Sequence, residues 1–103
     1  MRFIRPISLN NKSFILDVRT PEEYASETID LPHIYKDLRE LDPLDFIREN
    51  NIDEDKTINI LCASGGRASL AAEMFEKAGF HNVAVIIGGI VEAEYEGMDI
   101  IRH

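Results

Sequence analysis

The most constraining feature of this chain is a strand, a tight turn and a helix that follow one another directly. The run from Thr57 to Leu61 is short, apolar and rich in β-branched residues, which is typical of a buried strand. A turn of small residues follows, and from Arg67 to Ala78 the apolar spacing becomes that of a helix, which Gly79 ends. A strand that leads straight into a helix is the building unit of an α/β fold with a parallel sheet.

Further strands and helices are expected on both sides of this unit. Apolar runs and turn residues predict strands at Phe3–Ile4, Phe14–Val18, Leu31–Ile34 and Val83–Ile87, and helices from Thr20 onward, over Asp42–Asn50 and over Ile90–Glu96. The helix after Thr20 has a clear start, because Pro21 suits the first helical position and Glu23 completes a capping box with Thr20. Together these elements predict one α/β domain over residues 1–103, with a mostly parallel sheet flanked by helices on both faces in three layers.

The chain's single cysteine, Cys62, stands at the junction of the predicted strand and helix. Helix N-termini and nearby cations stabilise a thiolate, which is the nucleophilic form of cysteine. A competing interpretation is a buried structural cysteine, since free cysteine is among the most buried residue types. A structural cysteine, however, does not need two glycines and an arginine in the next five positions. We therefore predict that Cys62 is a catalytic nucleophile.

The residues after Cys62 have the properties of an anion-binding loop. Ala63 and Ser64 are small, and Gly65 and Gly66 allow the backbone to curl closely around an anion. The Ser64 hydroxyl can donate a further hydrogen bond. Arg67 adds a positive charge, and since a cation is unfavourable at a helix N-terminus, an anionic partner is expected for it, with Asp17 as one candidate.

Three residues fall at the carboxyl ends of predicted strands, where ligands collect in parallel sheets: Asp17, Cys62 and Gly88. Asp17 and Arg19 are therefore candidate supporting residues. A structural role is favoured for them over catalysis, because carboxylates at strand ends commonly accept backbone N–H groups or pair with arginine.

Composition narrows the classes of partner. The net charge of −8 argues against nucleic acid and against anionic membranes, which favour basic surfaces. No apolar run approaches the length of a membrane span, and the N-terminus does not have the pattern of a signal peptide. A lone cysteine without a secretion signal indicates the cytoplasm.

The three histidines are far apart in the sequence, so neither a metal site nor a cofactor is predicted. The acidic segment Asp37–Asp45 is expected to be a solvated face.

The loop Cys62-Ala-Ser-Gly-Gly-Arg67 resembles the active-site loop of the rhodanese (sulfurtransferase) family, which begins with cysteine and often has arginine five positions later. Two further segments agree with this family. Phe14–Tyr24 contains the Asp-Val-Arg sequence at a strand end, and Val83–Ile90 is a strand followed by a Gly-Gly turn. The resemblance extends from about Ile4 to Ile101.

Three places depart from the family pattern. The segment Thr28–Pro32 keeps only the isoleucine of the usual His-Ile-x-Gly-Ala, while Ala93 and Asp99 replace a tryptophan and a proline.

The resemblance implies a rhodanese-like fold and a sulfurtransferase. The Cys62 thiolate would take the outer sulfur of a donor such as thiosulfate, mercaptopyruvate or a protein persulfide, and would become a persulfide. It would then pass the sulfur to a thiophilic acceptor, which could be cyanide, a small thiol or a partner protein. The loop amides, Ser64 and Arg67 would stabilise the persulfide.

Two other functions remain open from the residues. Cysteine phosphatases and arsenate reductases have similar loops, but with five residues between cysteine and arginine, whereas four separate Cys62 from Arg67. A non-catalytic rhodanese-like docking module is the second alternative. The presence of Cys62 argues against it, because inactive relatives generally lose this cysteine.

Overall fold

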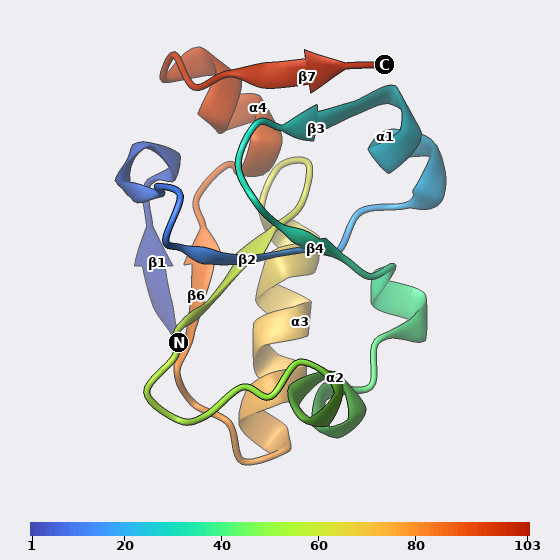
Figure 1. Cartoon of the computed structure of the whole chain (residues 1–103), viewed down its shortest axis with the longest axis vertical. Coiled ribbons are helices and arrows are strands. Elements are labelled where there is room, and N and C mark those ends of the chain that lie inside the picture. Colours follow the sequence, from blue (N-terminus) through green and yellow to red (C-terminus); the bar gives the residue numbers. More distant parts are fainter.

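The computed structural model describes every residue from Met1 to His103 and is built around a five-stranded sheet (Figure 1). All strand pairs of this sheet are parallel, and the strand order is β1-β6-β5-β2-β4. Its strands are β1 (Arg2–Ile4), β2 (Phe14–Asp17), β4 (Ile34–Tyr35), β5 (Ile58–Leu61) and β6 (Val83–Ile86). A separate antiparallel pair is formed by β3 (Glu27–Ile29) and β7 (Ile100–Arg102).

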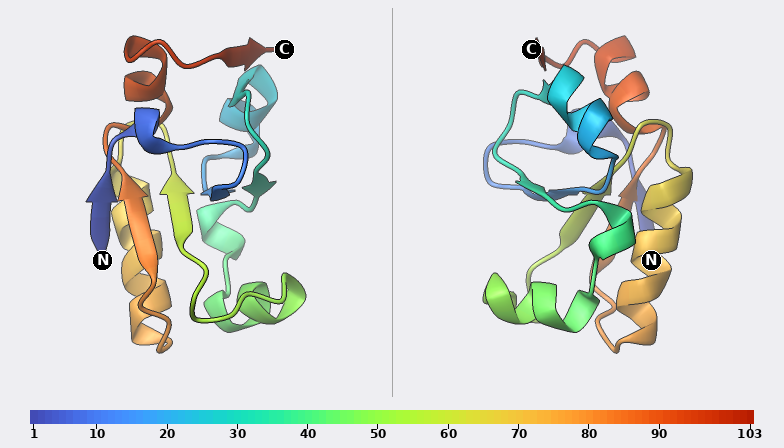
Figure 2. Two further views of the ribbon diagram at one scale, coloured as in Figure 1. Left: turned by 60° about the vertical axis from the view of Figure 1, so that its left-hand side comes forward. Right: turned by 90° about the vertical axis from the view of Figure 1, so that its right-hand side faces the viewer.

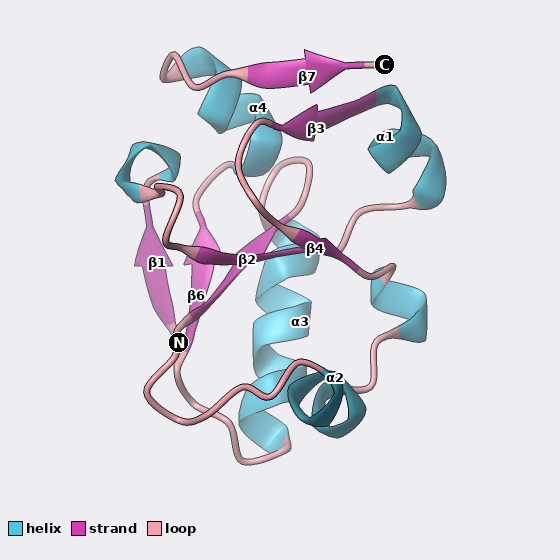
Figure 3. Ribbon diagram, in the orientation of Figure 1, coloured by secondary structure: helices cyan, strands magenta, loops and turns pink.

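Helices connect the strands, as a parallel sheet requires (Figure 3). They are α1 (Pro21–Ser26), α2 (Pro43–Glu49), α3 (Gly66–Lys77) and α4 (Gly89–Tyr95), with 3₁₀ turns η1 (Pro6–Ser8) and η2 (Leu38–Glu40). The predicted capping box of α1 is present, with reciprocal bonds between Thr20 and Glu23. None of the helices has the length and apolar character needed to cross a membrane.

Two apolar clusters lie on opposite faces of the sheet, because side chains alternate along each strand. Ile58 and Ile60 of β5 belong to the larger cluster, into which α3 buries Phe75 and α2 buries Phe46. Leu61 belongs to the smaller cluster, to which α4 contributes Ile90 and Ala93 and β3 contributes Ile29. Side chains of α2 and α3 therefore pack on one face of the sheet, and side chains of α4 and β3 pack on the other. Figure 2 shows α4 and the β3–β7 pair beyond the carboxyl ends of the central strands. This arrangement confirms the predicted α/β fold with helices on both faces.

Three details differ from the sequence-based expectations. The strand expected at Leu31–Ile34 is instead Ile34–Tyr35, because Pro32 lacks an N–H for strand pairing and the pairing is with the carboxyl end of β2. The β3–β7 pair was not anticipated. Asp37 is not part of a solvated face: it is buried, caps η2 and pairs with Arg39.

The parallel strands bring their carboxyl ends to one edge of the sheet. Asp17 and Leu61, the last residues of β2 and β5, are register partners. The residues that follow them, Val18 and Cys62, therefore lie next to each other. The backbone N–H of Val18 donates to the carbonyl of Leu61 at 2.9 Å. This edge is therefore where the predicted loop residues meet.

Candidate active site

Cys62 lies immediately after β5, at the inner side of the loop that leads into α3. The backbone N–H of Gly65 donates to the Cys62 Sγ at an N···S distance of 2.8 Å. Gly65 has a φ of +114°, a left-handed conformation that favours glycine and that turns this N–H toward the sulfur. Cys62 is only 1% exposed, whereas Ser64 and Gly66 are exposed on the outer side of the loop. A backbone donor at the N-terminus of a helix thus faces the sulfur, and such a contact stabilises negative charge there.

The Gly88-Gly89 turn packs against the back of the same loop. The first N–H groups of α4 find their acceptors in the loop: Ile90 donates to the carbonyl of Cys62 at 2.9 Å, and Val91 donates to the carbonyl of Ala63 at 3.2 Å. Both glycines have positive φ. The conformation of the Cys62 loop is therefore fixed from the side of β6 and α4, a role that the sequence did not reveal.

Arg67, in the first turn of α3, has an anionic partner as expected, but that partner is Glu23 of α1. Its Nη1 donates to Glu23 Oε1 at 2.6 Å and its Nη2 donates to Glu23 Oε2 at 2.9 Å. The Arg67 hydrogen bonds, together with those from Thr20, lower the pKa of Glu23 from 4.5 to about 2, so Glu23 is ionised throughout the neutral range. In return, Glu23 raises the pKa of Arg67, and the charges of Cys62 and Asp17 add to this effect. The suggested pairing of Arg67 with Asp17 was wrong.

Asp17 forms its ion pair with Arg19 instead. The side chains are 0% and 1% exposed, respectively, and Arg19 Nε and Nη2 donate to the Asp17 carboxylate at 2.8 to 3.0 Å. Arg19 Nη2 also donates to the carbonyl of Glu27 at 2.7 Å, where α1 ends and β3 begins. The pair thus ties the end of β2 to the segment that carries Glu23, which is a supporting role rather than contact with the loop.

A cluster of rings lies on the other side of α1. Tyr24 stacks on Tyr35 with ring centroids 4.2 Å apart, and the Tyr24 hydroxyl is 2.8 Å from His33 Nε2. His33 Nδ1 is 2.8 Å from the carbonyl of Leu31, which can only accept, so Nδ1 carries the proton and Nε2 accepts from Tyr24. Burial raises the pKa of Tyr35, whose hydroxyl donates to the carbonyl of Arg19. These rings support the segment after α1.

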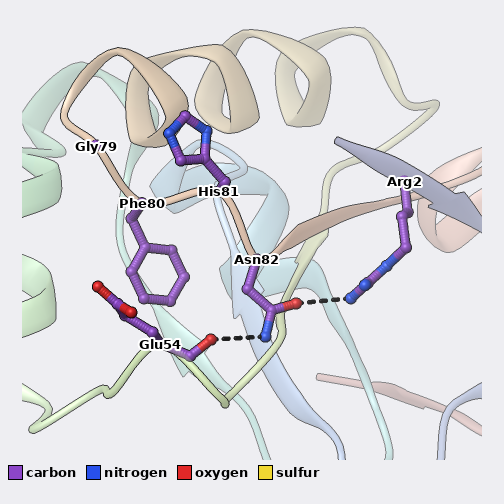
Figure 4. A pocket seen from close by; sticks show the side chains of 6 residues that line it. All are labelled: Arg2, Glu54, Gly79, Phe80, His81 and Asn82. Atoms are coloured by element: carbon purple, nitrogen blue, oxygen red, sulfur yellow. Dashed lines mark hydrogen bonds between the residues drawn. The ribbon is translucent and has the colours of Figure 1, made fainter.

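The larger surface depression is far from Cys62 in the fold. It has a volume of about 480 Å³ and is lined by Arg2, Glu54, Gly79, Phe80, His81 and Asn82. Figure 4 shows that Asn82 links its neighbours, accepting from Arg2 at 2.7 Å and donating to the carbonyl of Glu54 at 3.0 Å. Because Arg2 begins β1 and Asn82 precedes β6, this depression lies at the amino ends of the strands, the edge opposite the Cys62 loop. No group of three histidine, cysteine, aspartate or glutamate side chains could hold a metal ion.

The sequence is matched by the family described as "Rhodanese-like domain" over residues 5–95. Together with the five-stranded parallel sheet and the cysteine loop at its carboxyl edge, this match places the protein in the rhodanese-like domain family.

Individual relatives agree with this membership. "Putative sulfur carrier protein YrkF" of Bacillus subtilis is 38% identical over 77 residues, which are 74% of this chain. The chain spans only 38% of the length of that relative. The crystal structure of a rhodanese-related protein from Thermoplasma volcanium superposes with a TM-score of 0.76 at 29% identity, covering 98% of both chains. A NAD-dependent persulfide reductase from A. fulgidus is 31% identical with a TM-score of 0.66, over 87% of this chain and 15% of that one.

Proposed function

We propose that this protein is a sulfurtransferase that carries sulfur as a persulfide on Cys62. The observation that carries the proposal is the hydrogen bond from the Gly65 N–H to the Cys62 Sγ at the N-terminus of α3. That donor stabilises an anionic sulfur, whether it belongs to a thiolate or to a persulfide. The relatives named for sulfur carriage and for persulfide reduction support sulfur as the transferred atom.

In the first half-reaction, the Cys62 thiolate attacks the outer sulfur of a sulfane donor such as thiosulfate. A new S–S bond forms on Cys62 while the S–S bond of the donor breaks, and the electron pair of that bond leaves with sulfite. The total charge is unchanged, because a thiolate and a thiosulfate dianion become a persulfide anion and a sulfite dianion. No oxidant or reductant is needed.

In the second half-reaction, a thiophilic acceptor attacks the outer sulfur of the persulfide. With cyanide the products are thiocyanate and the regenerated Cys62 thiolate. In a cell, the acceptor would be a small thiol or a partner protein, and the single cysteine fits a reducing compartment such as the cytoplasm.

The geometry gives less support to a phosphatase. Phosphate transfer needs a cationic group free to bind the equatorial oxygens of the phosphoryl group. Arg67, the cation of the loop, is instead paired through both terminal nitrogens with Glu23. The loop also has one residue fewer between cysteine and arginine than the phosphatase loops it resembles.

The proposal is tested by assaying thiocyanate formation from thiosulfate and cyanide, and phosphate release from an aryl phosphate, in the wild type and in Cys62→Ser. We expect thiocyanate formation that depends on Cys62 and no phosphate release. Phosphate release that depends on Cys62 would favour the phosphatase. A folded wild type without either activity, and without sulfur uptake from other sulfane donors, would favour the docking module.

A further inference from the structure

Arg67 is the only cationic residue in the loop, and its charge is already neutralised by a carboxylate. Both of its terminal nitrogens donate to the two carboxylate oxygens of Glu23, in the two-pronged geometry that makes arginine–carboxylate pairs strong. The two side chains are 34% and 33% exposed, so water reaches the pair but does not separate it. An anionic sulfur donor that approaches Cys62 therefore meets a neutral pair rather than a free guanidinium.

Two other arginines at this end of the sheet are paired with carboxylates as well. Arg19 is buried and bound to Asp17. Arg39 is paired with Asp37, and this carboxylate is itself close enough to Arg67 for the Arg67 charge to contribute to its lowered pKa. The chain as a whole carries a net charge of −8. The carboxyl edge of the sheet is thus poorly suited to attract a doubly charged anion.

We propose that Glu23 determines donor specificity: by engaging Arg67 it disfavours dianionic thiosulfate and directs the site toward a sulfane sulfur carried on a thiol. This inference rests on the proposed sulfurtransferase function. The Cys62 thiolate attacks the outer sulfur of R–S–SH, an S–S bond forms on Cys62, and the donor S–S bond breaks. The electron pair leaves with R–S⁻, which takes a proton from water, and the Cys62 persulfide retains the original sulfur-bound proton or releases it to solvent.

The role of Glu23 can be tested with a substitution that removes its charge and leaves the start of α1 intact. Glu23→Gln removes the charge but retains a residue that can complete the capping box with Thr20, since glutamine serves this position as well as glutamate. The positive charge of Arg67 would then no longer be neutralised and could attract dianionic thiosulfate. Glu22→Gln is the matched control, because Glu22 lies next to Glu23 in the first turn of α1 and is exposed.

The measurement is the single-turnover rate of Cys62 persulfidation, followed by intact mass, with thiosulfate and with a thiol persulfide. Cysteine persulfide represents a small-thiol source and a persulfidated protein thiol represents a protein source. We expect Glu23→Gln to raise the ratio of the thiosulfate rate to the persulfide rate about tenfold, the scale of one gained hydrogen bond to a charged group. We expect Glu22→Gln to change the ratio by less than about twofold, as is usual for an exposed charge.

Two further variants keep the inference falsifiable. Arg67→Gln leaves the negative charge of Glu23 without its partner and should lower the ratio of the thiosulfate rate to the persulfide rate. In the double variant Glu23→Gln/Arg67→Gln, the increase expected for Glu23→Gln should disappear. Two results would contradict the role of Glu23 in donor specificity while leaving the proposed function intact. One is an equal ratio for Glu23→Gln and Glu22→Gln, and the other is a raised ratio that persists when Arg67 is also replaced. Absence of sulfur uptake by the wild type from any of these donors would instead contradict the proposed function.

Discussion

Gly89 stands directly against Cys62: a Cβ built on Gly89 would lie 2.2 Å from the Cys62 carbonyl oxygen. It would also lie 2.6 Å from the carbonyl carbon and oxygen of Ala63. These are backbone atoms, which cannot rotate away as a flexible side chain could. Gly89 also has a φ of +59°, a conformation that costs other residues free energy. The turn before α4 and the cysteine loop can therefore approach this closely only with glycine at position 89.

Gly89→Ala is expected to lower the free energy of unfolding by about 2 kcal/mol or more and to slow persulfidation of Cys62, since either the loop or α4 must move. The matched control is Gly97→Ala. Gly97 also has a positive φ, of +91°, but no atom lies within 4 Å of its Cβ position. The free energy of unfolding of this control should fall by about 1 kcal/mol, and its rate of Cys62 persulfidation should be unchanged. Urea unfolding and timed mass measurements give both quantities, and equal effects of the two substitutions would contradict this account of the turn.

Asp17→Asn is expected to destabilise the protein by about 3 to 5 kcal/mol, because it leaves the buried guanidinium of Arg19 without its counterion. Arg48→Ala provides a comparison. Arg48 forms a pair with Asp45 in which the side chains are 71% and 61% exposed, and its loss should cost less than about 0.5 kcal/mol. Thermal or urea unfolding distinguishes the two. Similar losses for both variants would show that the Asp17–Arg19 pair does not stabilise the end of β2.

The Glu23–Arg67 pair predicts a specific pH dependence. Since folding lowers the pKa of Glu23 from 4.5 to about 2, the pair stabilises the folded state fully above pH 4.5, and this contribution is lost as the pH falls through about 2. Because Glu23 is one third exposed, we expect a contribution of only about 1 to 2 kcal/mol. The wild type should therefore exceed Glu23→Gln in unfolding free energy at about pH 6, and the excess should shrink toward pH 2. An excess that stays constant over this range would argue against the pair.

Much of the fold followed from local patterns. The runs at Phe14–Val18, Thr57–Leu61 and Val83–Ile87 are long enough and apolar enough to identify the three central strands of the sheet, and their alternation with helices implies parallel pairing. The β3–β7 pair could not be predicted from local sequence patterns. Its strands have three residues each and come from opposite parts of the sequence, so no local pattern connects them.

The site was predictable only in part. The sequence makes Cys62 and its loop candidates because strand, glycines and helix are consecutive, and the structure places this loop between β5 and α3. Glu23 appeared only as a capping residue, since the same carboxylate completes the capping box and binds Arg67 across 44 positions of sequence. The positive charge of Arg67 at a helix N-terminus predicted an anionic partner but did not indicate which residue it is. The contact of Gly89 with the loop likewise depends on how α4 packs, and a Gly-Gly pair alone indicates only a turn.

The persulfide is expected to leave Cys62 only by transfer to another molecule. Many modified cysteines are resolved by a second cysteine of the same chain, and this chain has none. The persulfidated protein should therefore survive desalting, form no internal disulfide, and lose its added sulfur when cyanide or excess thiol is supplied. Loss of the added sulfur at the same rate with and without an acceptor would contradict release by transfer alone.

The most direct test of the central claim is the intact mass of the protein after incubation with thiosulfate and, separately, with cysteine persulfide. The account predicts one added sulfur atom on the wild type with at least one of these donors, complete removal of that atom by cyanide, and no addition to a folded Cys62→Ser variant. A wild-type mass that neither donor changes, or sulfur added equally to Cys62→Ser, would contradict a persulfide carried on Cys62.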